Sequence, residues 1–192
     1  MRADARRNRE RLLDAADAVF AESGTDTSTE EVARRAGVGI GTVFRHFPTK
    51  EALLEAVFVA RLSRLAARAD ELVDDPDPGT AFFRFLDALV GMAGSKKALS
   101  DALAGAGVDV TEAAAPAKAD VRRAAVALLH AAQEAGTVRA DLGGEELMAL
   151  MVGLARTAEQ TAHDPALQAR VTGLLTDGLR AGDQGRYQQG AR

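Results

Sequence analysis

Apolar residues recur along this chain mostly at the three- and four-residue spacing of a helix that buries one face. The first such stripe contains Leu12, Leu13, Ala16, Val19 and Phe20. Almost no stretch shows the alternation of apolar, β-branched and polar residues that is typical of a strand. The pattern therefore predicts an all-α protein.

Breaks in this periodicity at glycine and proline predict about nine helices. The segment 74–79 holds two prolines and one glycine and separates the first four helices from the others. Residues 182–192 have no apolar periodicity and are predicted to be a disordered tail. The predicted helices cover about residues 5–23, 28–36, 40–47, 50–73, 80–93, 96–104, 116–135, 144–162 and 165–179.

Residues 28–50 contain the start and stop signals of two short helices. Ser28 with Glu31 three residues later predicts a capping box, and Gly37 follows where a helix can end at positive φ. A second short segment then stops before Pro48. Two short helices joined by a glycine turn are typical of the DNA-binding helix-turn-helix, whose second helix enters the major groove. The alternative is an ordinary helical hairpin.

The particular residues favour DNA binding. The run Ala36-Gly-Val-Gly-Ile-Gly-Thr-Val-Phe-Arg-His-Phe-Pro-Thr-Lys-Glu-Ala-Leu53 resembles the signature of the TetR family of bacterial transcriptional repressors. The upstream pattern Leu13-x-Ala-Ala-x-x-x-Phe20-x-x-x-Gly24 is similar to that family as well. The resemblance covers about the first quarter of the chain, and the remainder matches in length and helical character. Two positions depart from the family: Phe44, where tyrosine is frequent, and Thr25, where an aromatic residue is common.

The resemblance implies a three-helix DNA-binding domain over residues 1–49 and a larger helical ligand-binding and dimerisation domain over residues 50–181. It also implies a repressor that binds a palindromic operator in double-stranded DNA as a homodimer and is released by an unknown small-molecule effector. A dimer is expected on physical grounds too, because a two-turn helix reads few base pairs. The alternative function is an all-helical protein-interaction module without DNA binding.

Charge is distributed unevenly over a chain whose net charge is −4. Residues 1–50 carry nine Lys or Arg and eight Asp or Glu, whereas the other 142 residues carry fifteen and twenty. Five of those arginines lie in the first eleven residues. We interpret them as a basic arm directed toward DNA phosphates; the alternative is a solvated terminus.

Composition excludes several other classes of protein. The chain has no cysteine, which removes disulfides, thiolate metal sites and cysteine nucleophiles. Its three histidines are scattered, and no glycine-rich phosphate loop, nucleophile elbow or metal-ligand spacing occurs. We therefore expect no enzymatic activity, cofactor or metal. No signal-peptide core and no run of 18 apolar residues is found, so we expect a cytoplasmic protein without membrane contact.

The candidate base readers lie on the second short helix. Arg45 is the first of them, because its planar fork matches guanine O6 and N7; the alternative is an intramolecular salt bridge or solvent. Thr42 can donate to a base or a phosphate, and Ile40 or Phe44 can touch a thymine methyl, although Phe44 has the alternative of packing on the first helix. Gly41 lets the backbone approach the groove closely.

Three further residues are candidate phosphate anchors. Ser28 and Lys50 stand at predicted helix starts, where free N–H groups attract phosphate. The resemblance assigns the same role to His46 and Lys50, whose family counterparts usually hold the DNA backbone.

Two sets of apolar residues in the second domain are candidates for an effector pocket and for a dimer interface. The alternative for both sets is that they belong to the hydrophobic core of the chain itself. We expect the first set to line an effector pocket: Phe82, Phe83, Leu86, Leu89, Met92, Leu103, Val121 and Leu128, with His130 and Gln133 as polar groups. We expect the second set to pair into a four-helix bundle across a two-fold axis: Leu147, Met148, Met151 and Leu154 on one helix, with Val171, Leu174 and Leu175 on the next.

Overall fold

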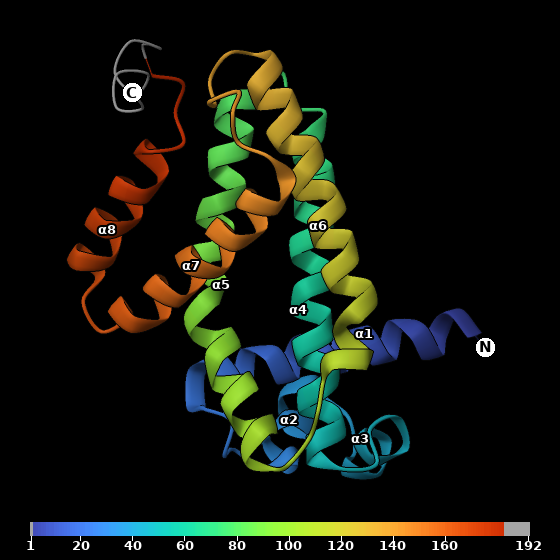
Figure 1. Cartoon of the computed structure of the whole chain (residues 1–192). Helices are drawn as coiled ribbons and strands as arrows, with labels where there is room; N and C mark the ends of the chain where they lie inside the picture. Colours follow the sequence, from blue (N-terminus) through green and yellow to red (C-terminus); the bar gives the residue numbers. More distant parts are fainter. Residues whose placement is uncertain (1, 183–192) are drawn as a thin grey trace. The chain divides into compact units, whose positions relative to one another are not determined.

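The structure, a computed structural model, describes residues 2–182, apart from the side chains of residues 2–5 and 94–96. The predicted all-α fold is confirmed, with a three-helix N-terminal part that contains the helix-turn-helix (Figure 1). Except for Gly182, the predicted tail lies outside the described residues. The helices are α1 (Arg2–Ser23), α2 (Thr29–Ala36), α3 (Ile40–His46), α4 (Lys50–Val73), α5 (Pro78–Gly105), α6 (Thr111–Glu134), α7 (Gly144–Thr161) and α8 (Pro165–Asp177).

Helix α5 is continuous, where the sequence predicted separate helices over 80–93 and 96–104. It begins at Pro78, since proline fits the first helical position, and Asp77 caps it by accepting a hydrogen bond of 3.0 Å from the Thr80 N–H. A glycine inside a helix costs only about 1 kcal/mol. Packing along a long helix outweighs that cost, so Gly94 does not end α5.

Helix α6 begins at Thr111, earlier than the start predicted near Pro116. The reason is a local cap: the Thr111 N–H donates to Asp109 Oδ1 at 2.8 Å. Hydrogen bonds from the Thr111 hydroxyl and backbone N–H lower the pKa of Asp109. Pro116 removes one backbone donor near the helix start, and the helix runs through it.

The chain forms two compact units, which we describe separately. Unit 1 comprises the described residues of Met1–Arg64 and Ser95–Lys118, and unit 2 those of Leu65–Gly94 and Ala119–Arg192. Helices α4, α5 and α6 contribute residues to both. The domain boundary predicted after residue 49 stays a prediction.

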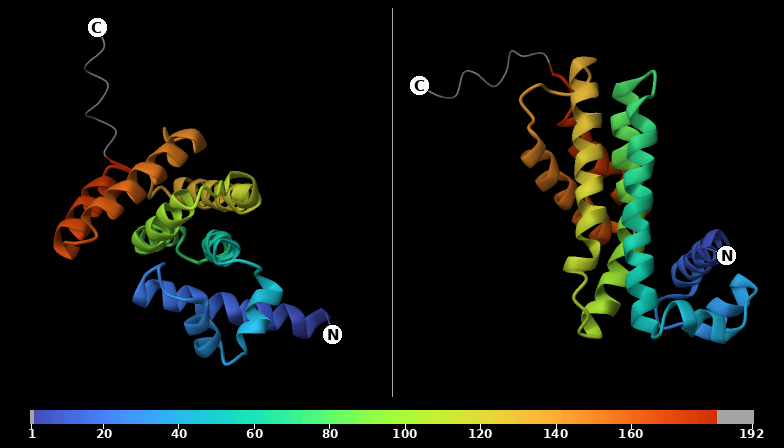
Figure 2. Two further views of the ribbon diagram at one scale, coloured as in Figure 1. Left: turned by 90° about the horizontal axis from the view of Figure 1, so that it is seen from below. Right: turned by 90° about the vertical axis from the view of Figure 1, so that its right-hand side faces the viewer.

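In unit 1 the two short helices α2 and α3 lie beside α1 (Figure 2). The apolar stripe of α1 is buried, as expected. Leu12 and Ala16 of α1, Val32 of α2, Val43 of α3 and Leu53 of α4 have no exposed surface. Each of the first four helices therefore gives this core at least one fully buried side chain.

Unit 2 buries aromatic and aliphatic side chains of α5, α6 and α7 in one cluster. Its C-terminal end is fastened by backbone hydrogen bonds: the Arg139 N–H donates to the Leu179 oxygen and the Ala181 N–H to the Thr137 oxygen, both at 3.0 Å. The Arg180 guanidinium also lies 4.2 Å from the Phe83 ring centre. Over the described residues, no helix combines the length and apolarity needed to cross a bilayer.

Candidate nucleic-acid interface

The first helix of the helix-turn-helix is capped by Ser28, as the sequence predicts. Its hydroxyl accepts a hydrogen bond of 3.4 Å from the Glu31 N–H. The Glu31 carboxylate does not complete the capping box, because it binds Arg34, whose Nε lies 2.8 Å from Oε2. That hydrogen bond lowers the pKa of Glu31. Glu30 and Glu31 place negative charge in the first turn of α2, which works against Ser28 as a phosphate anchor.

The turn between α2 and α3 depends on Gly37. Its φ of 68° and ψ of 34° lie in the left-handed region, where a side chain is unfavourable. The Gly37 N–H donates to the Arg34 oxygen at 3.2 Å, and the Val38 N–H donates to the Ala33 oxygen at 3.0 Å. These two bonds form a Schellman motif, which ends α2 and reverses the chain within three residues.

Helix α3 is two turns long and is held by two inward side chains. Val43 is fully buried and Phe47 is 3 % exposed. The Phe47 N–H donates to the Val43 oxygen at 2.8 Å, and Phe47 is extended before Pro48, which ends the helix. With these residues inward, Gly41, Phe44 and Arg45 are exposed.

Phe44 is 44 % exposed, which favours DNA contact over packing on the first helix. Ile40, Thr42 and His46 are partly exposed beside it. Helix α3 has no acidic residue in its first turn and carries Arg45 and His46 in its last. This surface is therefore basic and apolar, and it can meet phosphates as well as thymine methyl groups.

Neighbouring ion pairs decide which arginine of this region can read bases. Arg35 of α2 binds Glu22 of α1 with Nη1–Oε2 at 3.0 Å and Nη2–Oε1 at 2.8 Å, and Arg34 binds Glu31. Within the part of the chain that the structure describes, Arg45 has no ion-pair or hydrogen-bond partner for its guanidinium. Arg45 is therefore the arginine of residues 28–50 whose planar fork stays available to a base edge.

Helix α4 starts beside α3 with a cap from Thr49. The Thr49 hydroxyl accepts a hydrogen bond of 3.1 Å from the Ala52 N–H. Lys50, a predicted phosphate anchor, is partly exposed and occupies the first helical position, where the free N–H groups of a helix start also attract phosphate. Glu51 stands next to it, and hydrogen bonds from its own N–H and from Thr49 lower its pKa.

The basic arm at the start of α1 reaches the end of α3. The Arg9 guanidinium lies 5.1 Å from the ring centre of Phe47, a cation–π contact. Arg6, Arg7 and Arg11 are exposed on the same helix. This contact places at least one arginine of the arm next to the candidate base-reading helix.

A four-residue ion-pair network ties α1 to α4 within unit 1, and sequence reasoning missed it. Arg61 binds Asp17 with Nε–Oδ1 and Nη2–Oδ1 distances of 2.5 Å. Arg64 binds both Asp17 and Asp14. The only signal in the sequence is a pair of aspartates three residues apart on α1 and a pair of arginines with the same spacing on α4. Such a spacing of charges is common on solvent-exposed helix faces.

The predicted effector-pocket residues are divided between the two units. Phe82, Leu86 and Leu128 are at most 1 % exposed in the core of unit 2, and Leu103 belongs to unit 1. The other apolar candidates, Phe83, Leu89, Met92 and Val121, are core residues or pack against the core.

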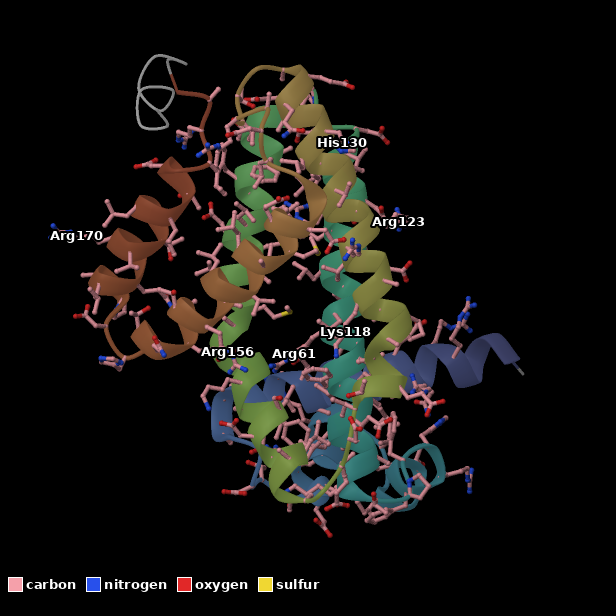
Figure 3. The ribbon with its side chains drawn as sticks, viewed as in Figure 1. Arg61, Lys118, Arg123, His130, Arg156 and Arg170 are labelled. Atoms are coloured by element: carbon pink, nitrogen blue, oxygen red, sulfur yellow. The ribbon has the colours of Figure 1, made fainter. Side chains whose placement is uncertain are left out.

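The two polar pocket candidates are placed differently from the prediction. His130 is exposed on α6 (Figure 3). The Gln133 amide donates to the backbone oxygens of Arg139 and Leu142, each at 2.9 Å, and so holds the loop after α6. The Gln133 side chain thus satisfies two backbone oxygens of the loop, which accounts for a polar residue at this position. Effector binding by the whole set stays a prediction.

The predicted dimer residues also divide into two groups. Leu147, Met151 and Leu154 are 0 %, 6 % and 5 % exposed, because α7 turns them toward the core of its own chain, and pairing with a second chain through them stays a prediction. Met148 packs against the same core. On α8, Leu174 is 67 % and Leu175 41 % exposed, with Val171 partly exposed beside them.

An apolar cavity of about 170 Å³ opens between α5, α7 and α8. Leu150 and Leu175, each 41 % exposed, stand on its rim from α7 and α8. Gly153 also lines it, and a Cβ added there would meet no other atom within 4 Å. Leu86 is the one member of the ten predicted pocket residues that lines this cavity; the other nine do not.

Family models match both parts of the chain. The model described as "Bacterial regulatory proteins, tetR family" matches residues 12–57. The model described as "Transcriptional regulator SbtR-like, C-terminal domain" matches residues 77–181, more than half of the chain.

Solved structures agree with these matches. A TetR transcription regulatory protein from Mycobacterium vanbaalenii is 43 % identical, with a TM-score of 0.76 over 93 % of this chain and 98 % of its own. A TetR transcriptional regulator from Streptomyces coelicolor is 32 % identical, with a TM-score of 0.73 over 91 % and 99 %. An HTH-type transcriptional regulator of Staphylococcus aureus is 34 % identical over 76 residues, which span 39 % of this chain and 41 % of that protein.

A capped α2, a left-handed glycine turn and a short basic α3 define a helix-turn-helix transcriptional regulator that acts by binding DNA. The relatives from Staphylococcus aureus and Mycobacterium vanbaalenii are both transcriptional regulators. With matches to its N-terminal and C-terminal models, the chain belongs to the TetR family.

Proposed function

We propose that this regulator is a repressor that binds a palindromic operator as a homodimer and releases it when a small-molecule effector binds. The observation that carries the operator contact is the exposed Arg45, which has no ion-pair partner in the described part of the chain and stands on a helix anchored by Val43. We assign base reading to Arg45 and Thr42, with Ile40, Gly41 and Phe44 shaping the contact. The phosphate anchors are Lys50, His46 and, despite its acidic neighbours, Ser28.

Homodimerisation is supported by the outer surface of α7 and α8. Leu167, Val171 and Leu174 follow one another at spacings of four and three residues along α8, and Leu175 continues the stripe. Leu167 and Leu174 are 42 % and 67 % exposed, so this stripe forms an exposed apolar surface of the kind that marks an interaction site. A second copy that packed against this stripe would bury it in a four-helix bundle.

The effector response is proposed from the family and from the size of the helical part that follows the helix-turn-helix. Neither the DNA-binding unit nor the dimer stripe needs a catalytic group, so we propose a regulator without enzymatic activity or cofactor. Such a protein acts at the chromosome, which in bacteria lies in the cytoplasm.

Salt dependence of duplex binding tests this function. The full chain is incubated with fragments of its own genome, bound duplexes are recovered, and the affinity for the best duplex is measured over a series of salt concentrations. Release of condensed counterions predicts that the logarithm of affinity falls linearly with the logarithm of salt. Affinity that is absent or flat across the fragment pool would favour a protein-interaction module instead.

The recovered duplexes also test the homodimer. Two inverted half-sites whose centres lie about one helical turn apart, or a multiple of it, are expected. A single unrepeated site, together with a monomeric mass in light scattering at micromolar protein, would contradict the dimer. The genes beside the recovered sites would indicate the chemical class of the effector.

A further inference from the structure

The apolar cavity of about 170 Å³ between α5, α7 and α8 lies entirely within unit 2. Ala149 and Gly153 of α7 line it and leave space there, because one has only a methyl group and the other no side chain. Leu86 of α5 and Leu147 of α7 line it as well and are at most 1 % exposed. The cavity therefore reaches the core of unit 2 from a mouth at the surface.

Among the described residues, no charged side chain lines this cavity. A wider hollow of about 530 Å³ adjoins it and shares four of its lining residues, Leu175 among them. Arg139 and Asp141 lie in that hollow and bind each other, with Nε–Oδ1 at 2.5 Å and Nη2–Oδ2 at 2.6 Å. Burial of an unpaired charge is costly. The cavity therefore favours an uncharged ligand.

The polar residues on the cavity wall are two threonines, Thr157 of α7 and Thr176 of α8. The Thr176 hydroxyl is engaged, since it lies 3.0 Å from the Thr172 oxygen and 3.1 Å from the Gly173 oxygen. Thr157 accepts a hydrogen bond from the Thr161 hydroxyl through its backbone oxygen. The hydroxyl of Thr157 itself has no hydrogen-bond partner within the described part of the chain. One unpaired hydroxyl on an apolar wall matches a ligand with one polar group.

From this we infer that the cavity binds an uncharged molecule of about the size of benzene that carries one hydroxyl or carbonyl group, with Thr157 as its hydrogen-bond partner. The inference rests on the proposed effector response and deepens it by naming a site and a chemical class. An apolar cavity of roughly 150 Å³ holds one benzene molecule, and the volume here is similar. Water finds few polar partners in such a cavity, so an apolar ring displaces it readily.

The mouth of the cavity lies at the proposed dimer surface. Leu175 stands on its rim and also continues the exposed stripe of α8. A second copy that packed on this stripe would cover the mouth, and a bound ligand would then lose more of its apolar surface to the protein interior. The competing occupant is a side chain of that second copy, which crystals of the dimer distinguish from a small molecule.

Xenon tests whether the cavity takes a small apolar occupant, because it enters apolar cavities and its X-ray scattering locates it. Crystals of the full chain, of Gly153→Leu and of the matched control Gly91→Leu are pressurised with xenon. An added Cβ meets nothing within 4 Å at either glycine, but Gly153 lines the cavity and Gly91 does not. We expect a xenon peak between α5, α7 and α8 in wild type and in Gly91→Leu, and no peak in Gly153→Leu.

Phenol and benzene test the polar group in solution. Calorimetry measures the affinity of both molecules for wild type and for Thr157→Val, which has nearly the same shape and no hydroxyl. Thr157→Val should bind phenol about threefold to tenfold more weakly, as expected for the loss of one hydrogen bond. Its affinity for benzene should equal that of wild type, and Gly153→Leu should bind neither molecule.

Two results would overturn this ligand site. One is a wild-type crystal in which a side chain of the second copy fills the cavity and xenon is absent from it. The other is phenol affinity that neither Gly153→Leu nor Thr157→Val changes, which would place phenol elsewhere. If Gly153→Leu does not fold, the position of xenon in wild type and the Thr157→Val titration still decide. No DNA is present in these assays, so failure here is distinct from failure of operator binding in the salt titration.

Discussion

Arg35 of α2 holds Glu22 of α1 through two parallel hydrogen bonds, at 3.0 Å for Nη1–Oε2 and 2.8 Å for Nη2–Oε1. The pair ties the first helix of the helix-turn-helix to the helix beneath it, and it withdraws Arg35 from DNA. Arg34 is withdrawn in the same way by Glu31. The two arginines of α2 are thus engaged in ion pairs, and the Arg45 guanidinium of α3 has no such partner among the described residues.

Replacement of Arg45 by alanine should cost about 1–3 kcal/mol of operator affinity and relax the base preference, because a bidentate contact to guanine is lost. The matched control is Arg34→Ala, which removes an exposed arginine already bonded to Glu31 and should change affinity much less. Gel-shift titrations against operator and scrambled duplex, at one salt concentration, measure both quantities. Unchanged affinity and unchanged preference in Arg45→Ala would remove it from the interface.

Gly41→Ala should separate folding from DNA binding. A Cβ at Gly41 would meet nothing within 4 Å, and Gly41 lies inside α3 with an ordinary helical backbone. The alanine should therefore stabilise the fold, by about 0.5–1 kcal/mol. Operator affinity should nevertheless fall, since the added methyl group would stand where the backbone approaches the groove.

Gly91→Ala is the matched control, because Gly91 is an exposed helical glycine of α5 with open space at its Cβ. It should raise the melting temperature similarly and leave operator affinity unchanged. Thermal melting and gel-shift titration of both variants provide the comparison. An affinity of Gly41→Ala equal to that of wild type would contradict close approach of α3 to DNA at this position.

The Glu22–Arg35 pair should make stability depend on acid pH. The hydrogen bond from Arg35, followed by its charge, lowers the pKa of Glu22. A carboxyl whose folded pKa is lowered stabilises the fold above its unfolded pKa, and that contribution is lost as pH falls through the folded pKa. Wild type should thus melt slightly above Glu22→Gln at neutral pH, and the difference should vanish once the pH falls below the ordinary range of glutamate.

The size of this effect is small because both side chains are well exposed to solvent and salt. Glu134→Gln is the control, since Glu134 is exposed and has no ion-pair partner among the described residues. Melting temperatures of the three proteins over a pH series measure the difference. A gap between wild type and Glu22→Gln that stays constant down to strongly acidic pH would show that the pair does not act through charge.

Gly153→Glu should break the homodimer without harm to the single chain. Gly153 is exposed on α7, and an added Cβ would meet nothing within 4 Å. Glutamate also favours a helix over glycine by roughly 0.5–1 kcal/mol. If a second copy covers the apolar cavity beside Gly153, a buried unpaired carboxylate would oppose that contact strongly.

Light scattering at micromolar protein should show a dimer for wild type and for Gly91→Glu, and a monomer for Gly153→Glu. Operator affinity should fall with the dimer, because each half-site is then bound alone. Helicity measured by circular dichroism should stay as in wild type. A dimeric Gly153→Glu with full operator affinity would place the interface elsewhere.

The sequence by itself determined the local parts of the DNA-binding site. Ser28, Gly37 and Thr49 act within four residues of the backbone groups they cap or turn, so their roles could be read from the chain. The burial of Val43 and Phe47 is local in the same sense, because helical spacing and the proline after α3 account for it.

Tertiary structure decided everything that depends on residues far apart in the chain. Helical periodicity marked Leu147, Met151 and Leu154 as apolar, but only packing shows that they face their own core, while Leu174 remains exposed. Likewise, the sequence alone does not distinguish Arg35, Arg45 and Arg61. Arg35 binds a glutamate 13 residues away and Arg61 binds an aspartate 44 residues away. Arg45 has no such partner among the described residues. Such pairings arise from how helices cross, which no local spacing encodes.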